Sequence, residues 1–141
     1  MPVDLKTVQG EALLQNSDTP WADYPRPQMR RDSYVNLNGD WQFEVLHQGK
    51  TLYNNTIRVP FCPESALSGV KMDVAPGSYL FYRRQVSLPE SQRTGRVLLH
   101  IGAADQIAEV YVNRIRVGTH FGGYEAFSFD ITHTLQPENE L

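Results

Sequence analysis

The most regular pattern in the sequence is an alternation of apolar and polar positions in its second half. Three segments place every second residue on one apolar face, at 97–101, 108–112 and 127–131. A period of two is typical of half-buried antiparallel strands, because successive side chains point to opposite faces of a sheet. We therefore predict three strands here, with Glu109 and Tyr111 on the face opposite the core.

A tight turn is predicted inside this half. Asn113 and Arg114 separate the strand at 108–112 from a further short strand at 115–117. Two-residue hairpin turns need positive φ at both central residues and favour Asn-Gly. We therefore expect a hairpin that is mildly strained at Arg114.

The first half carries weaker versions of the same pattern. Strands are predicted at 41–45, at 57–59 and as one continuous segment from 79 to 88. The residues between the first two are interpreted as a polar connection, and residues 136–140 as a turn.

A long loop and an arm complete this organisation. Residues 61–78 form a loop, and loops of this length in compact domains are often functional. Residues 1–34 are interpreted as an extended N-terminal arm, because three prolines fall close together there. The pattern predicts an all-β sandwich over residues 35–141, with jelly-roll and immunoglobulin-like topologies both open.

Composition narrows the function classes. The 141 residues fit one domain, and the net charge of −3 gives no electrostatic reason to expect nucleic acid or an anionic membrane as a partner. The single cysteine, Cys62, excludes an internal disulfide. The first ten residues lack the apolar core of a secretory signal, and no apolar run approaches the roughly 18 residues of a membrane helix. We expect a cytoplasmic protein.

Residue types alone reveal no catalytic centre. The four histidines lack metal-ligand spacing, and neither a phosphate-binding loop nor a nucleophile elbow is present. Asp130 is interpreted as a turn-capping residue, and the run Arg30-Arg31-Asp32 as a solvated patch. Aromatic residues flank the loops, where sugars can stack on rings, although core and rim packing is the favoured explanation. These are Tyr79, Phe81, Phe121 and Tyr124.

Four runs in one order resemble the N-terminal sugar-binding domain of glycoside hydrolase family 2, which includes β-galactosidases, β-glucuronidases and β-mannosidases. The runs are LNGDWQF at 37–43, VPFCPESALSGV at 59–70, YLFYRRQVSLP at 79–89 and LLHIGAADQIAEVYVNRIRVGTHFGGYEAFSFDIT at 98–132. The resemblance covers residues 35–141 and departs from the family at Arg114, where glycine is usual.

The resemblance implies a jelly-roll sandwich that packs on a catalytic barrel. Both catalytic glutamates of the family belong to that barrel, so it implies a non-catalytic domain without a cofactor of its own. The parent enzyme is expected to be a retaining exo-β-glycosidase acting on β-galactoside-type carbohydrate, most closely a β-galactosidase. A stand-alone carbohydrate-binding module and a purely structural scaffold domain are the alternatives.

Two further expectations follow from the resemblance. The candidates for the rim of a substrate cavity are Glu64, Ser65, Asp73 and Tyr79, although turn formation and interdomain packing explain the loop residues equally well. Residues 139–141 resemble the beginning of one more strand, so the sandwich is expected to be cut short. An unpaired strand edge would favour self-association, which a clean monomer in light scattering at high concentration would contradict.

Overall fold

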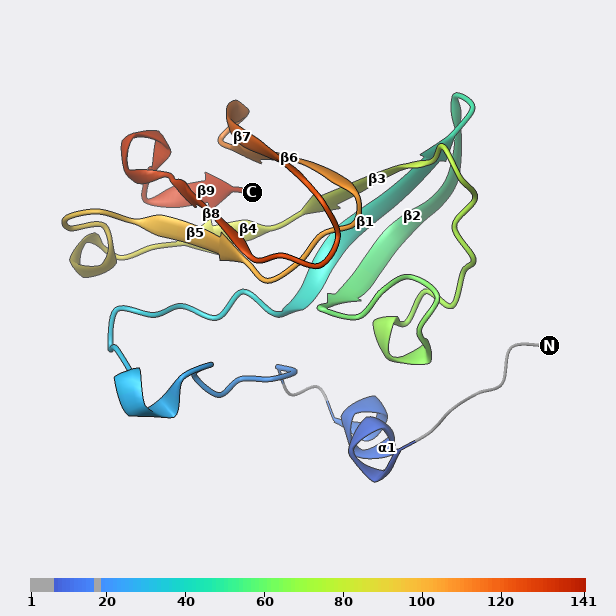
Figure 1. The fold of residues 1–141 in the computed structure, drawn as a ribbon, viewed down its shortest axis with the longest axis horizontal. Helices are drawn as coiled ribbons and strands as arrows, with labels where there is room; N and C mark the ends of the chain where they lie inside the picture. The colour runs from blue at the N-terminus through green and yellow to red at the C-terminus, as the bar shows by residue number, and fades with distance from the viewer. Residues whose placement is uncertain (1–6, 17–18) are drawn as a thin grey trace. The chain divides into compact units, whose positions relative to one another are not determined.

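The computed structural model describes residues 7–16 and 19–141. This part of the chain holds nine strands, one α-helix and four short 3-10 helices, in two compact units (Figure 1). The chain passes from the first unit to the second between Tyr82 and Arg83, and the division of the chain at residue 34 stays a prediction. No helix among the described residues is both long and apolar enough to cross a membrane.

The first unit is built on a long hairpin. Its strands β1 (Gly39–His47) and β2 (Lys50–Val59) are joined by Gln48 and Gly49, both with positive φ, and the strand order in the sheet is β2-β1-β3. Outside the hairpin lie α1 (Val8–Gln15), η1 (Pro27–Met29), η2 (Ala66–Ser68) and β3 (Tyr79–Arg83).

The core of this unit comes from the predicted strands at 41–45 and 57–59. Phe43, Val45 and Ile57 are at most 1% exposed, and the Phe43 ring lies 4.7 Å from the ring of Tyr82, between centroids. The prediction of a polar connection before residue 57 was wrong, because β2 already begins at Lys50. Its first seven residues are almost all exposed and pair with β1, and among them Tyr53 is half-buried and packs against the core.

The irregular character predicted for the arm was wrong at α1. Thr7 caps this helix, since its side-chain oxygen accepts a 3.0 Å hydrogen bond from the Gly10 amide. The Arg58 guanidinium on β2 donates to the carbonyl oxygens of Leu13 and Asn16, which lie at the end of α1. The carbonyls that a helix leaves unpaired at its C-terminus are thus partly satisfied by a side chain from the sheet.

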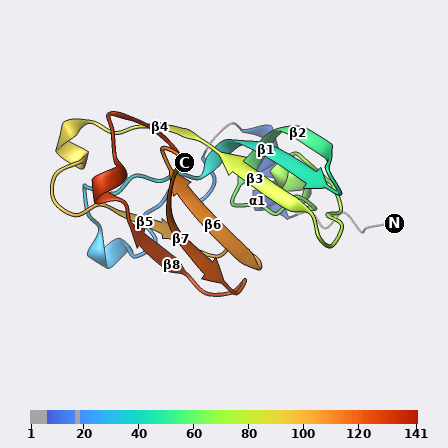
Figure 2. The same ribbon diagram turned by 90° about the horizontal axis from the view of Figure 1, so that it is seen from above.

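The second unit contains three antiparallel strand pairs and a small core of Val86, Leu99, Val112 and Ile131. Figure 2 shows two of these pairs, β5 with β8 and β6 with β7. The elements are β4 (Gln85–Ser87), η3 (Glu90–Gln92), β5 (Leu98–Ile101), β6 (Ile107–Val112), β7 (Ile115–Phe121), β8 (Phe127–Asp130), η4 (Thr132–Thr134) and β9 (Glu138–Glu140).

Two boundaries of the second unit differ from the prediction. The strand expected over 79–88 is divided at Arg84, whose backbone N–H and C=O pair with those of Leu141. The turn expected over 136–140 contains β9, which pairs with β4 in antiparallel fashion. The C-terminal residues therefore complete the pairing of the segment after Arg84.

The predicted hairpin between β6 and β7 is confirmed. Val112 faces Ile115 across the turn, and Asn113 and Arg114 have φ of 51° and 67°. Arg114 therefore adopts the left-handed conformation that glycine tolerates better, as the sequence predicts.

A buried asparagine joins this hairpin to β9. Asn139 is 1% exposed, and its Oδ1 accepts hydrogen bonds from Asn113 Nδ2 at 2.9 Å and from the Gln136 amide at 2.8 Å. Its Nδ2 donates to the carbonyls of Gln136 and Val86. Asn113 in turn donates to the Thr134 carbonyl and accepts from the Glu140 amide. The two amide side chains thus hold the turn, η4 and β9 together.

Candidate functional site

The loop at 61–78 is an ordered structure held by its own polar groups. Ser68 is 2% exposed, and its hydroxyl donates to the Ser65 carbonyl at 2.7 Å while accepting from the Val70 amide. The Met72 amide donates to the Pro63 carbonyl. These bonds close the loop around η2, so its outward-facing side chains are presented from a fixed backbone.

The four predicted rim residues divide into two kinds. The Ser65 hydroxyl accepts a hydrogen bond from the Leu67 amide and caps η2, which is the turn-forming alternative. Glu64, Asp73 and Tyr79 are exposed, and Tyr79 is the first residue of β3. No hydrogen bond or ion pair in the described part of the chain links these three to one another. Their role at a substrate rim stays a prediction.

Tyr82 is a residue that the sequence analysis did not select. Burial is the main cause that raises the pKa of Tyr82 to about 12, and the negative charge of Glu64 adds to it. A tyrosine phenol is protonated at neutral pH in any case, and Glu64, whose charge acts on it, is exposed to solvent. A phenol O–H can donate to a sugar hydroxyl, and a carboxylate can accept from one. The alternating pattern assigned Tyr82 to a core face, and the effect of the Glu64 charge on its pKa depends on the fold.

A hollow of about 250 Å³ is lined in part by residues 66–69 of the loop. None of the four predicted rim residues lines it. Its walls come from α1, the β1–β2 hairpin and η2, through Leu14, Asp40, Thr56, Arg58 and residues 66–69. The described residues also contain no group of three or more His, Cys, Asp or Glu side chains that could hold a metal ion.

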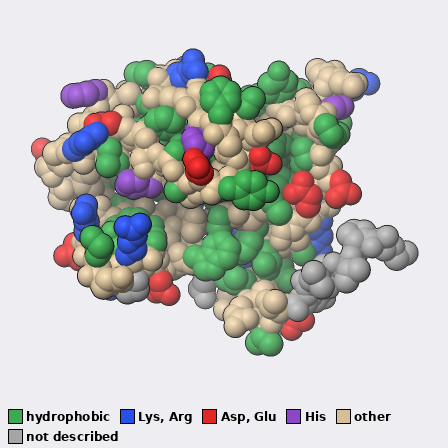
Figure 3. Space-filling view, viewed as in Figure 1, with side chains coloured by type: hydrophobic (Ala, Val, Ile, Leu, Met, Phe, Trp, Pro, Cys, Tyr) green, Lys and Arg blue, Asp and Glu red, His purple; other side chains and the backbone are tan. Residues whose placement is uncertain are grey.

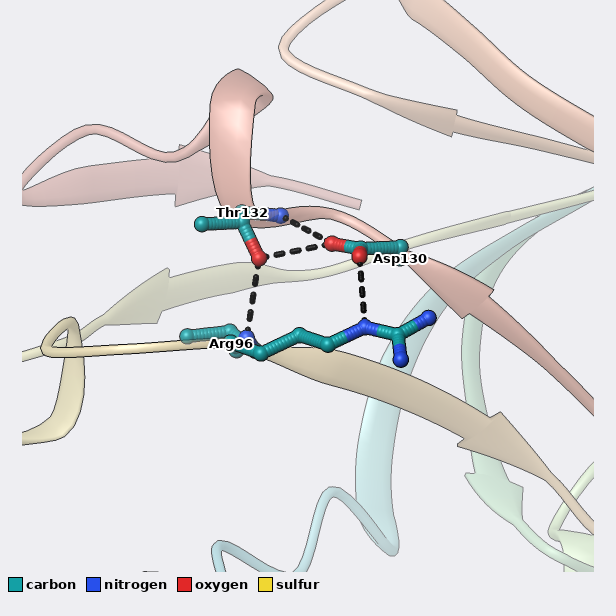
Figure 4. Close-up of polar contacts among 4 residues, drawn as sticks. Arg96, Asp130 and Thr132 are labelled. Carbon is teal, nitrogen blue, oxygen red and sulfur yellow. Dashed lines mark hydrogen bonds and ion pairs between the residues drawn. The ribbon is translucent and has the colours of Figure 1, made fainter.

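Asp130 has the capping role that the sequence predicts (Figure 4). Its Oδ1 accepts hydrogen bonds from the hydroxyl and the amide of Thr132, at 2.6 and 3.1 Å. Its Oδ2 pairs with Arg96 Nε at 2.8 Å. The Thr132 hydroxyl, followed by Arg96 and the Thr132 amide, lowers the pKa of Asp130 from 3.8 to about 2. This carboxylate ties β8 to the start of β5 and is not free for catalysis.

The lowered pKa predicts a pH dependence of stability. Because the folded chain binds the Asp130 proton more weakly than the unfolded chain, the ionised carboxylate stabilises the fold above pH 4. That contribution is lost as the pH falls from about 4 to about 2. Urea unfolding should show a gap between wild type and Asp130→Asn that is constant above pH 4 and closes toward pH 2. Glu125→Gln, at an exposed acid of the same unit, is the control, and an unchanged gap at pH 2 would refute the assignment.

Comparison with known proteins shows the family to which the chain belongs. No family model matches it. A β-glucuronidase of Bacteroides fragilis is 34% identical over 104 residues, which cover 71% of this chain and 14% of that enzyme. A solved β-glucuronidase of Bifidobacterium dentium superposes with a TM-score of 0.59 at 25% identity, over 74% of this chain and 18% of the other. The chain belongs to the N-terminal domains of glycoside hydrolase family 2.

Other relatives of this family 2 domain carry different names. A β-galactosidase of Thermoanaerobacter pseudethanolicus is 37% identical over 59 residues, covering 42% of the chain and 8% of the enzyme. The β-D-mannosidase of Dictyoglomus thermophilum gives a TM-score of 0.61 at 21% identity, over 75% of this chain and 14% of that one, which shows a shared fold. The predicted family and its all-β sandwich class are confirmed. The family 2 domain spans a small part of the relatives it matches, 14% and 8% of the first two.

Proposed function

We propose that this family 2 domain is the non-catalytic N-terminal part of a retaining exo-β-glycosidase. The observation that carries the proposal is the 34% identity to a β-glucuronidase over 71% of the chain. The family resemblance assigns the acid/base glutamate and the nucleophilic glutamate to a barrel domain. The domain then contributes binding and positioning rather than bond cleavage.

β-Glucuronides are the first substrate class to test, and β-galactosides are the second. Support for the first comes from matches to β-glucuronidases over 71% and 83% of the chain. The β-galactosidase match is 37% identical but covers only 42% of the chain. This match supports β-galactosides as the second substrate class, which the sequence analysis expects. The cytoplasmic location and self-association stay predictions.

Within the domain, Glu64 and Tyr82 form the pair best suited to a substrate hydroxyl. Glu64 is an exposed residue of the loop at 61–78, and Tyr82 is protonated at neutral pH, as tyrosine ordinarily is, so it can donate a hydrogen bond. Both groups would act on the bound substrate rather than on the bond that breaks. Their loss is therefore expected to raise KM more than it lowers kcat.

The test uses the protein that contains this chain together with the rest of its gene product. We expect 4-nitrophenyl β-glucuronide to be cleaved with a higher kcat/KM than the β-galactoside and the β-mannoside. The isolated 141 residues are expected to cleave none of them. Turnover by the pure 141-residue chain would refute the non-catalytic role, and a preference for the galactoside would favour the second substrate class.

Two variants test the rim pair in the same enzyme. Glu64→Gln and Tyr82→Phe each remove one hydrogen-bonding group and are expected to raise KM about tenfold, since a hydrogen bond to a charged group contributes on the order of 1.5–3 kcal/mol. Glu90→Gln and Tyr124→Phe are matched controls at exposed positions of the second unit. Unchanged KM in both rim variants would show that the pair does not reach the substrate.

A further inference from the structure

A second hollow, of about 310 Å³, lies entirely within the segment that leads into β1. Figure 3 shows basic and acidic side chains close together over the part of the chain that contains η1. The sequence analysis interpreted this region as a solvated patch. The charged and aromatic side chains that line the hollow are Asp23, Tyr24, Arg30, Arg31, Asp32 and Tyr34.

The guanidinium groups of the two arginines in this hollow are available to bind an anion. Arg30 and Arg31 are adjacent and exposed, and neither has a hydrogen-bond or ion-pair partner among the residues the structure describes. Two neighbouring positive charges repel each other, and a bound anion relieves that repulsion. The guanidinium fork matches the geometry of a carboxylate, with two parallel N–H···O bonds.

The other lining residues favour an anion that also carries a ring and hydroxyl groups. Tyr24 and Tyr34 meet edge to face, with centroids 4.7 Å apart and an angle of 71° between the ring planes. Such a pair offers an apolar surface to the C–H face of a sugar ring. The carboxylates of Asp23 and Asp32 are acceptors for hydroxyl donors, whereas they would repel a bare inorganic anion.

We propose that this hollow binds a sugar acid, with its carboxylate on Arg30 and Arg31, its ring against the tyrosines and its hydroxyl groups on the aspartates. The site is separate from Glu64 and Tyr82, neither of which lines it. It does not depend on which glycoside the parent enzyme cleaves. If the hollow does not bind a sugar acid, the proposed glycosidase role is therefore unaffected.

The test is an amide NMR titration of the ¹⁵N-labelled 141-residue chain with glucuronate, glucose and inorganic phosphate. Glucuronate is expected to produce saturating shifts confined to residues 22–36, at least tenfold tighter than glucose, because only glucuronate offers a carboxylate to the guanidinium groups. Arg30→Ala and Arg31→Ala should each weaken glucuronate binding about tenfold. Arg26→Ala is the matched control, since it removes the same charge beside η1 but does not line the hollow.

The aspartates distinguish a sugar acid from a general anion. By charge alone, Asp32→Asn should strengthen the binding of any anion. If Asp32 accepts hydrogen bonds from sugar hydroxyls, the same change weakens glucuronate while it strengthens phosphate. The proposal is overturned if Asp32→Asn strengthens both ligands, if phosphate binds as tightly as glucuronate, or if Arg26→Ala weakens glucuronate as much as Arg30→Ala does.

Discussion

Replacing Asn139 with alanine is expected to lower the free energy of unfolding of the second unit by about 3 kcal/mol, because buried groups that lose their partners cost on the order of 1–3 kcal/mol each. The Asn139 side chain is 1% exposed and makes four hydrogen bonds, to Asn113, Val86 and both backbone groups of Gln136. Alanine leaves those partners without water to replace the amide.

Urea unfolding followed by far-UV circular dichroism measures this effect. Both tryptophans, Trp21 and Trp41, belong to the first unit, so tryptophan fluorescence reports that unit and serves as an internal comparison. Asn54→Ala, at an exposed position of β2, is the matched control and should change stability by less than about 0.5 kcal/mol. A loss below about 1 kcal/mol for Asn139→Ala would show that the amide network contributes little.

The second large effect is expected at Gly118 in β7. A Cβ atom added there would lie within 3.0 Å of three atoms of the Phe129 ring, a separation that real Cβ atoms essentially never show. Phe129 belongs to β8 and also contacts Phe127 edge to face. A shift of the Phe129 ring would alter that contact. Gly118→Ala should therefore destabilise the second unit by about 3 kcal/mol through overpacking.

A double-mutant cycle tests the cause of that loss. If the clash with the ring is responsible, adding Gly118→Ala to a Phe129→Ala background should cost far less than in the wild type. Gly102→Ala is the control, since a Cβ there meets nothing within 4 Å. Additive effects at positions 118 and 129 would place the cost in the backbone rather than in the ring.

The alternation of apolar and polar residues predicted the strands that have one buried face. It did not predict the segments that lack such a face. The strand at 108–112 was predicted because Val112 and its neighbours alternate between buried and exposed sides of β6. The first part of β2 escaped prediction because its two large apolar residues, Leu52 and Tyr53, are adjacent and do not alternate with polar ones. Helix α1 escaped for a related reason, since Gly10 is its only buried residue and no apolar stripe marks it.

The candidate sites show the same limit. Sequence motifs selected the loop at 61–78, which the structure shows to be ordered around Ser68. They could not select Tyr82, whose partner Glu64 lies 18 residues earlier in the sequence. The sequence analysis interpreted Arg30 and Arg31 as solvated charges. The hollow that they line together with the two tyrosines depends on how the segment folds back on itself, which the sequence does not show. Motifs identify residue types, whereas the meeting of distant or folded-back side chains depends on the three-dimensional path of the chain.

The turn after β6 restricts the choice of amino acid at position 113 in two independent ways. The φ of 51° favours glycine, asparagine or aspartate. The side chain must also donate to Thr134 and Asn139 and accept from the Glu140 amide. Glycine meets the first demand without the second, and aspartate has no N–H to donate. Asparagine alone among these three satisfies both, so a saturation library at this position should return asparagine even though the neighbouring Arg114 would be improved by glycine.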